Sequence, residues 1–254
     1  HGHHRRQRQM CIRDRFKKGD IVEDLRPNIY DPVEGTTIAD AEVERLPRKT
    51  KLVDVRWTCE DGTDLVISTT RPELICACGV VVVHPDDERY RHLVGQRITL
   101  PLPTEGRSTT VEIQQHPSVK SEFGTGVLMV CSFGDQNDVA VFRELGLAPF
   151  QAIDLNGTMT EVAGPLKGMP VLEARTKAIE MLDESARLVQ AVERDQDIPV
   201  SERGKNPVEI ILLKEWYVRQ THIQDRMRDH IDSIRFHPVR NRQFLLDWMD
   251  NISI

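Results

Sequence analysis

The sequence predicts an α+β protein with a compact β-rich centre and unequal helical arms. Short apolar runs separated by Gly, Pro and Asp turns recur between residues 51 and 131, which is typical of strands. An amphipathic pattern covers residues 173–188 and indicates a helix. The chain has 254 residues, 39% of them hydrophobic, so it can build one large domain, alone or with flanking pieces.

Composition excludes several classes of protein. The net charge of −6 argues against a protein that coats nucleic acid by general electrostatics. No run approaches the roughly 18 apolar residues of a membrane helix, and no signal peptide is evident, so we expect a cytoplasmic protein without a membrane partner. The five cysteines form no C-x-x-C pair and predict buried, reduced thiols. The HGHH start lacks further ligands, so no metal site is predicted.

The predicted strands follow one another through the first half of the chain. Residues 51–59 alternate apolar and polar side chains, and Asp61-Gly62 marks a hairpin turn into 65–67. Residues 79–83 are apolar without alternation, which favours a strand covered on both faces. Further predicted elements are a short helix at 86–95 and strands at 97–102, 109–115 and 127–130.

Helices dominate the predictions for the second half. Asp135 or Asn137 can cap a helix that buries Val139, Phe142 and Leu145 and ends at Gly146. After the amphipathic helix, two strands are predicted at 189–200 and 208–213, followed by two helical stretches beyond Trp216. Residues 1–20 show no hydrophobic period and are predicted to be a disordered basic tail or an artefact.

Three polar, glycine-punctuated turns each follow or precede an apolar run. They are T69-T-R-P-E-L, F123-G-T-G and F133-G-D-Q-N-D. Each has an ordinary structural explanation: the glycines permit a bulge, the aspartates cap a helix, and Arg71 lies on the surface. Two aspartates three residues apart also present acceptors toward one space, which suits an ammonium group and a hydroxyl or water. We therefore expect the three turns to line one pocket.

Two other kinds of catalytic site find no support in the sequence. Cys76, Cys78 and Cys131 have no obvious histidine partner, and no G-x-S-x-G elbow is present. Neither G-x-x-x-x-G-K-[ST] nor G-x-G-x-x-G occurs, so the chain lacks an ATP-binding signature of these types.

With these motifs in order, residues 28–250 resemble the editing insertion, and its flanks, of class I valyl-tRNA synthetases, especially the archaeal or eukaryotic-like branch. The resemblance also rests on H84-P-D-D-E-R-Y and K214-E-W-Y. It implies a β-barrel-like editing domain with peripheral helices. It further implies four segments: 1–20 as a tail, 21–50 as a linker, 51–213 as the editing domain, and 214–254 as a helical return toward the catalytic domain.

The function that this resemblance implies is hydrolysis of threonyl-tRNA(Val) made in error. A hydrophobic pocket cannot strongly reject an isostere that carries a hydroxyl, and these synthetases are themselves a standard example of that limit. The implied partners are the acceptor end of tRNA(Val), its mischarged threonyl ester and the remainder of the synthetase. The H-I-G-H and K-M-S-K-S motifs are absent, so ATP and Mg belong to the parent enzyme and editing needs no cofactor.

The resemblance also assigns roles to individual residues. Asp138 would bind the α-ammonium of the ester, and Asp135 would accept from the threonine hydroxyl or orient the attacking water. In the bacterial members of the family, the positions of Met129 and Cys131 look like Lys and Thr. The resemblance therefore implies that recognition of the threonine hydroxyl rests more on Asp135 in this chain. The implied substrate-binding set is Thr69, Thr70, Arg71, Phe123, Gly124, Thr125, Gly126, Met129 and Cys131.

Two alternatives stay open at this point. The chain could be a non-catalytic tRNA-binding or structural insert that acts only within a full synthetase, which would bind tRNA in a salt-dependent way without hydrolysis. It could also be an unrelated β-barrel binding protein, if Arg71, Asp135 and Asp138 lay far apart.

Overall fold

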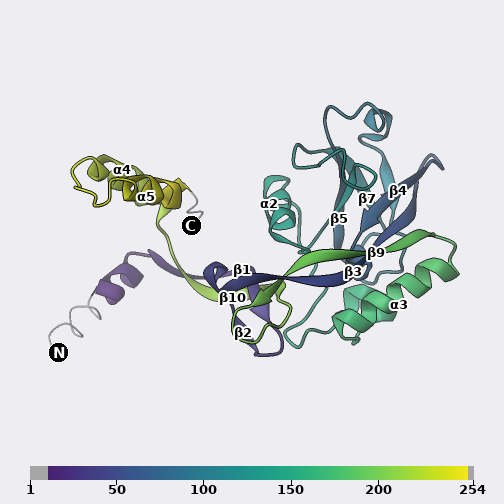
Figure 1. The fold of residues 1–254 in the computed structure, drawn as a ribbon, viewed down its shortest axis with the longest axis horizontal. Helices are drawn as coiled ribbons and strands as arrows, with labels where there is room; N and C mark the ends of the chain where they lie inside the picture. The colour runs from purple at the N-terminus through teal and green to yellow at the C-terminus, as the bar shows by residue number, and fades with distance from the viewer. Residues whose placement is uncertain (1–10, 251–254) are drawn as a thin grey trace. The chain divides into compact units, whose positions relative to one another are not determined.

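The computed structural model describes residues 11–250 and divides the chain into two compact units. One unit is Pro27–Leu212, and the other combines the chain before residue 27 with the chain after residue 212. Figure 1 traces both along the chain. Among the described residues, no helix is long and apolar enough to cross a membrane.

The elements alternate strands with short helices. The strands are β1 (Ile21–Asp31), β2 (Thr36–Thr37), β3 (Val43–Cys59), β4 (Asp64–Thr69), β5 (Cys78–Val83), β6 (Arg97–Thr99), β7 (Thr110–Gln115), β8 (Val127–Cys131), β9 (Leu188–Ser201) and β10 (Glu209–Val218). The α-helices are α2 (Gln136–Glu144), α3 (Val171–Glu184), α4 (Gln224–Ile231) and α5 (Asn241–Asp250), and residues 11–17 are also helical. The 3-10 helices are η1 (Asp40–Glu42), η2 (Pro72–Ala77), η3 (Arg91–Leu93), η4 (Glu161–Leu166) and η5 (Thr221–Ile223).

The centre of the larger unit is a strongly curled sheet. Its strands follow the order β4-β3-β6-β7-β5-β8, and β9 pairs along β3 outside this path. The end strands β4 and β8 also contact each other, so the sheet curls into a half-barrel (Figure 1). A second sheet has the order β10-β1-β2. The α+β class is confirmed, with an open half-barrel at its centre.

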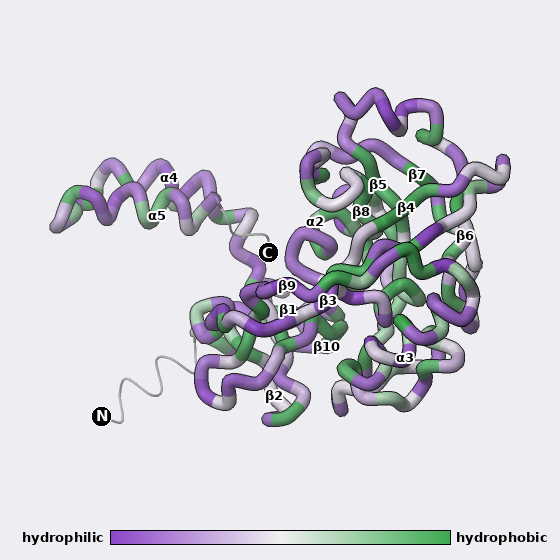
Figure 2. The backbone as a smooth tube through the Cα atoms, turned by 45° about the vertical axis from the view of Figure 1, so that its right-hand side comes forward, coloured by the Kyte–Doolittle hydropathy of each residue, from purple (hydrophilic) through white to green (hydrophobic). Residues whose placement is uncertain are grey.

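The core lies on both faces of β5. Its valines Val80 to Val83 are at most 1% exposed, and Figure 2 shows the run as hydrophobic. Burying each such side chain stabilises the fold by roughly 1.5–3 kcal/mol. On one face, Val141 and Phe142 of α2 pack with Val80, Val82 and Val130. This packing fixes α2, and therefore the turn that precedes it, against β5 and β8.

Helix α3 packs through one stripe of small and aliphatic residues. Val171, Ala174, Ala178 and Leu182 are buried at helical spacing, as the amphipathic pattern predicted. The helix contacts η2 and β9, and Figure 1 shows it alongside the sheet. It therefore reaches the segment that follows the T69-T-R-P-E turn.

Several predicted elements need correction. Residues 11–17 form a helix instead of a disordered tail, while residues 1–10 lie outside the described part. The segment read as a linker contains β1, β2 and the first half of β3. The predicted helix at 86–95 is reduced to η3. Residues 214–218 continue β10, and the two helical stretches predicted beyond Trp216 follow as α4 and α5.

Candidate functional site

The T69-T-R-P-E turn joins β4 to η2 and is closed by a hydrogen bond to the side chain of its first residue. Thr69 ends β4 and is buried, and its Oγ1 accepts the backbone N–H of Arg71 at 3.0 Å. Pro72 opens η2, where its missing N–H leaves no helical bond unmade. Thr70 is half-buried between them. The turn thus holds Arg71 in one backbone position.

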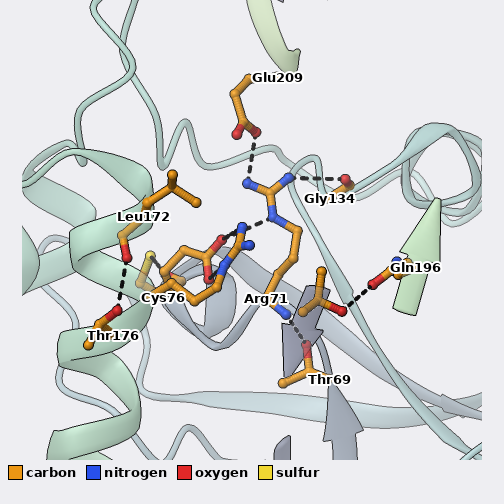
Figure 3. Close-up of polar contacts among 11 residues, drawn as sticks. Thr69, Arg71, Cys76, Gly134, Leu172, Thr176, Gln196 and Glu209 are labelled. Atoms are coloured by element: carbon orange, nitrogen blue, oxygen red, sulfur yellow. Dashed lines mark hydrogen bonds and ion pairs between the residues drawn. The ribbon is translucent and has the colours of Figure 1, made fainter. Parts of the chain in front are cut away.

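Arg71 connects this turn to the F133-G-D-Q-N-D turn. Its Nη1 donates to the Gly134 carbonyl at 3.3 Å, while Nη2 donates to Glu209 at 2.8 Å and Nε to Glu73 at 3.0 Å. Figure 3 shows the guanidinium bonds to Gly134 and Glu209, and the separate bond from the Arg71 backbone N–H to Thr69. The pKa of Arg71 is raised despite its burial, because Glu209 and Glu73 stabilise the charge. Arg71 is therefore an internal anchor, not a solvated surface residue.

The two aspartates of the second turn differ sharply in environment. Asp135, one of the two predicted caps, is the exposed N-cap of α2, and its Oδ1 accepts from the backbone N–H groups of Asn137 and Asp138 at 2.8 and 3.0 Å. Asp138 is buried, and its Oδ2 accepts the Gly134 N–H at 2.9 Å. A Cβ on Gly134 would lie 2.5 Å from that oxygen, so a side chain at this position would displace the Asp138 carboxylate.

Burial makes Asp138 a weaker acid than an ordinary aspartate. Desolvation raises its pKa to about 7, the charge of Asp135 acts in the same direction, and the Gly134 N–H opposes both. Both protonation states are therefore present near neutral pH. A buried carboxylate whose pKa is perturbed in this way is a candidate for function.

The F123-G-T-G turn lies beside the same end of β4. Gly124 has φ +57°, and a Cβ there would lie 2.8 Å from the Ser68 side chain, one residue before Thr69. The Thr125 carbonyl accepts from Tyr90 Oη at 2.7 Å, and Gly126 is buried. Phe123 is 50% exposed, with the Arg194 guanidinium 5.4 Å from its ring centre.

The two remaining predicted residues are buried in β8. Met129 is 7% and Cys131 2% exposed. The pKa of Cys131 is raised well above its usual value, first by its hydrogen bond with Cys78, then by burial, with Asp138 among the further causes. Cys131 is thus a protonated thiol in the neighbourhood of Asp138. Cys59, Cys76 and Cys78 are also buried and free, as predicted, whereas Cys11 is exposed.

The structure therefore joins two of the predicted turns directly. Arg71, Gly134 and Asp138 form a continuous chain of hydrogen bonds, and the third turn contacts Ser68 next to Thr69. Within residues 11–250, no group of three or more His, Cys, Asp or Glu side chains is placed to hold a metal ion. The HGHH start lies outside these residues.

Sequence reasoning gave no role to three charged residues of the cluster around Arg71, although Glu73 belongs to the first motif. Glu73 is fully buried and binds both Arg71 and Arg175, and Glu209 is buried at the start of β10. The sequence held only weak signals that these residues are buried and charged. Arg175 follows Ala174 at the edge of the apolar stripe of α3, and Glu209 is a single acidic residue at the start of an apolar strand.

The comparison with protein families decides the relationship. The model of "tRNA synthetases class I (I, L, M and V)" matches residues 7–253. The chain belongs to this family. It is 40% identical over 247 residues to the valine–tRNA ligase of Aeropyrum pernix. The matched region covers 97% of this chain and 30% of that protein.

Two further relatives agree with this assignment. The valine–tRNA ligase of Nanoarchaeum equitans is 38% identical over 97% of this chain, and that of Rickettsia conorii is 32% identical over 96%. The match covers 32% and 30% of these proteins, so the class I synthetase chain spans about a third of their length. The predicted resemblance to valyl synthetases, with archaeal relatives prominent, is confirmed.

Proposed function

We propose that this chain is the editing module of a valine–tRNA ligase and hydrolyses threonyl-tRNA(Val). The observation that carries the proposal is the buried Asp138 carboxylate, held at the start of α2 by a turn that Arg71 joins to the end of β4. Similarity to valine–tRNA ligases over 97% of the chain supports the choice of substrate. In this proposal, valine activation with ATP and Mg belongs to the rest of the parent enzyme.

Asp138 in its ionised form binds the α-ammonium group of the ester. A carboxylate that has little water around it forms a strong charge-assisted hydrogen bond with an ammonium donor. Because burial raises the pKa of Asp138 to about 7, binding strengthens as pH rises through neutrality. The incoming ammonium itself favours the ionised carboxylate, so substrate binding and deprotonation are coupled.

Asp135 contributes its second carboxylate oxygen. Oδ1 makes both capping bonds to α2, and Oδ2 takes no part in the cap. In our proposal, Oδ2 accepts from the threonine hydroxyl or orients the attacking water. Met129 and the protonated Cys131 offer a thioether and a thiol, both weak hydrogen-bonding groups, so Asp135 carries more of the hydroxyl recognition.

Hydrolysis needs no covalent nucleophile in this scheme. Water adds to the ester carbonyl carbon and gives up a proton. The tetrahedral intermediate then collapses by breaking the bond between that carbon and the ribose oxygen, which takes up a proton and leaves as the terminal hydroxyl, and free threonine is released. Positioning supplies most of the acceleration for an ester that is already activated. In this proposal the turn of Thr69, Thr70 and Arg71, which Arg71 fixes from inside, holds the ester and terminal adenosine. Phe123 packs against the adenosine beside Gly124, Thr125 and Gly126.

Deacylation of threonyl-tRNA(Val) by the purified chain tests the proposal. We expect turnover above background, and Asp138→Asn should reduce it about ten- to a hundredfold, because a hydrogen bond to a charged group is lost. Glu144→Gln is a matched control on the same helix, since Glu144 is exposed and contacts His116 at 2.9 Å.

Three results are informative in this experiment. Turnover that depends on Asp138 and is unaffected by Glu144→Gln supports the proposal. Undiminished turnover in Asp138→Asn rejects the role of Asp138. Salt-dependent binding of tRNA without any hydrolysis would instead favour a non-catalytic tRNA-binding insert.

A further inference from the structure

Glu73 is a fully buried carboxylate shared by two arginines. Arg175 of α3 donates Nε to Oε2 at 3.0 Å and Nη2 to Oε1 at 2.8 Å, and Arg71 donates Nε to Oε1 at 3.0 Å. The side chain of Glu73 is 0% exposed. Two parallel bonds from one guanidinium fix the direction of a carboxylate as well as its position. Arg175 therefore determines how Glu73 is presented to Arg71.

Arg71 passes this constraint to the turn that carries Asp138. Its Nη1 holds the Gly134 carbonyl at 3.3 Å, and the Gly134 N–H in turn holds Asp138 Oδ2 at 2.9 Å. Gly134 is thus fixed on both its carbonyl and its amide side. Glu209 holds Nη2 of the same guanidinium at 2.8 Å and prevents it from turning freely.

The charges of this cluster balance only while Arg175 is present. Two guanidinium groups then face the carboxylates of Glu73 and Glu209. Without Arg175, both carboxylates would share Arg71, and a buried charge that loses a partner is strongly unfavourable. Arg71 would be drawn toward Glu73. Of its three side-chain bonds, the one to the neutral Gly134 carbonyl is weaker than the two to carboxylates, so it is the one that would be lost.

We infer that Arg175 is a positioning residue for the editing site, acting through Glu73 and Arg71 on the turn that presents Asp138. The inference rests on the proposed deacylation for its activity readout, while the state of Asp138 can also be followed directly. The other charged or titratable groups near Asp138 are Asp135 on its own helix cap and Cys131 on β8, and neither is altered in the experiment.

The experiment compares Arg175→Met and Arg175→Lys in the 254-residue chain. Asp138 is titrated by carboxyl NMR, and its signal is identified as the one that disappears in Asp138→Asn. Deacylation is measured as a function of pH, at a temperature at which every variant is folded. We expect Arg175→Met to raise the Asp138 midpoint by about half to one unit, because Asp138 loses a hydrogen bond that favours its charged form. The turnover number should fall about tenfold with a smaller change in KM.

Arg175→Lys should fall between the wild type and Arg175→Met, because it keeps the charge but not the two parallel bonds. Lys177→Met is the matched control: Lys177 lies on the same helix and contacts exposed Glu180 at 2.9 Å. This control should change neither the Asp138 midpoint nor turnover.

A purely structural role for Arg175 predicts a different outcome. Arg175→Met would then unfold at lower temperature, yet the folded protein would keep the wild-type Asp138 midpoint and turnover, and this result overturns the inference. If Arg175→Met does not fold, the same comparison with Arg175→Lys decides. If the wild-type chain shows no deacylation, the proposed function is rejected but the inference about Arg175 is not. The NMR titration still reports whether Arg175 acts on Asp138.

Discussion

The Asp138 carboxylate destabilises the fold that holds it. Its pKa is raised from 3.8 to about 7 by burial and by Asp135, so the native state binds more protons than the unfolded state between these values. The free energy of unfolding therefore falls as pH rises from about 4 to about 7, and the penalty is fully present above 7. We expect Asp138→Asn to be more stable than the wild type at pH 8, by up to about 4 kcal/mol.

Denaturant unfolding at pH 5 and pH 8 checks this expectation. The advantage of Asp138→Asn should shrink at pH 5, where the wild-type carboxyl is mostly protonated. Equal stability differences at the two pH values would contradict the raised pKa. A variant that gains stability at pH 8 while losing deacylation would indicate that this strain is kept for function.

At this scale, the sequence predicted what is local and missed what is distant. Asp135 was one of two predicted helix caps, and the capping could be predicted because its two bonds reach only two and three residues along the chain. Arg175 and Glu209 meet Glu73 and Arg71 across 102 and 138 residues, a separation that no local pattern reports. The third turn was placed near the first, but its contact runs through Ser68, which no motif contained.

Helix α2 links capping to chemistry. Asp135 satisfies two backbone N–H groups at its start, so Asp135→Ala should lower the free energy of unfolding by about 1 kcal/mol. Asp135→Asn keeps a capping oxygen and should cost much less. Because the Asp135 charge raises the pKa of Asp138, Asp135→Asn should also lower the Asp138 midpoint. Denaturant unfolding and NMR titration measure the two effects separately.

The same pair of variants separates two roles of Asp135. If its carboxylate selects the threonine hydroxyl, Asp135→Asn should reduce the preference for threonyl over valyl ester although the helix stays capped. An intact preference in Asp135→Asn would assign Asp135 to capping alone.

Strand prediction succeeded where burial imposes a pattern. The non-alternating run of β5 and the alternating second half of β3 were identified because one or both faces are buried. The first half of β3 escaped prediction because residues 43–50 are mostly polar and partly exposed. Its extended form comes from the long antiparallel ladder with β9, which pairs Val43 with Ser201. Such distant partners cannot be read from composition.

The two units of the molecule differ in the size of their cores. Nearly all buried hydrophobic residues lie in Pro27–Leu212, whereas Ile231 and Met249 are those of the described part of the other unit. Local opening is easiest where few apolar contacts must be broken. We therefore expect amide hydrogen exchange in α4 and α5 to be at least about tenfold faster than in β5 and β8. Mass spectrometry of peptides from these elements measures the difference, and equal protection would show that the two units unfold as one.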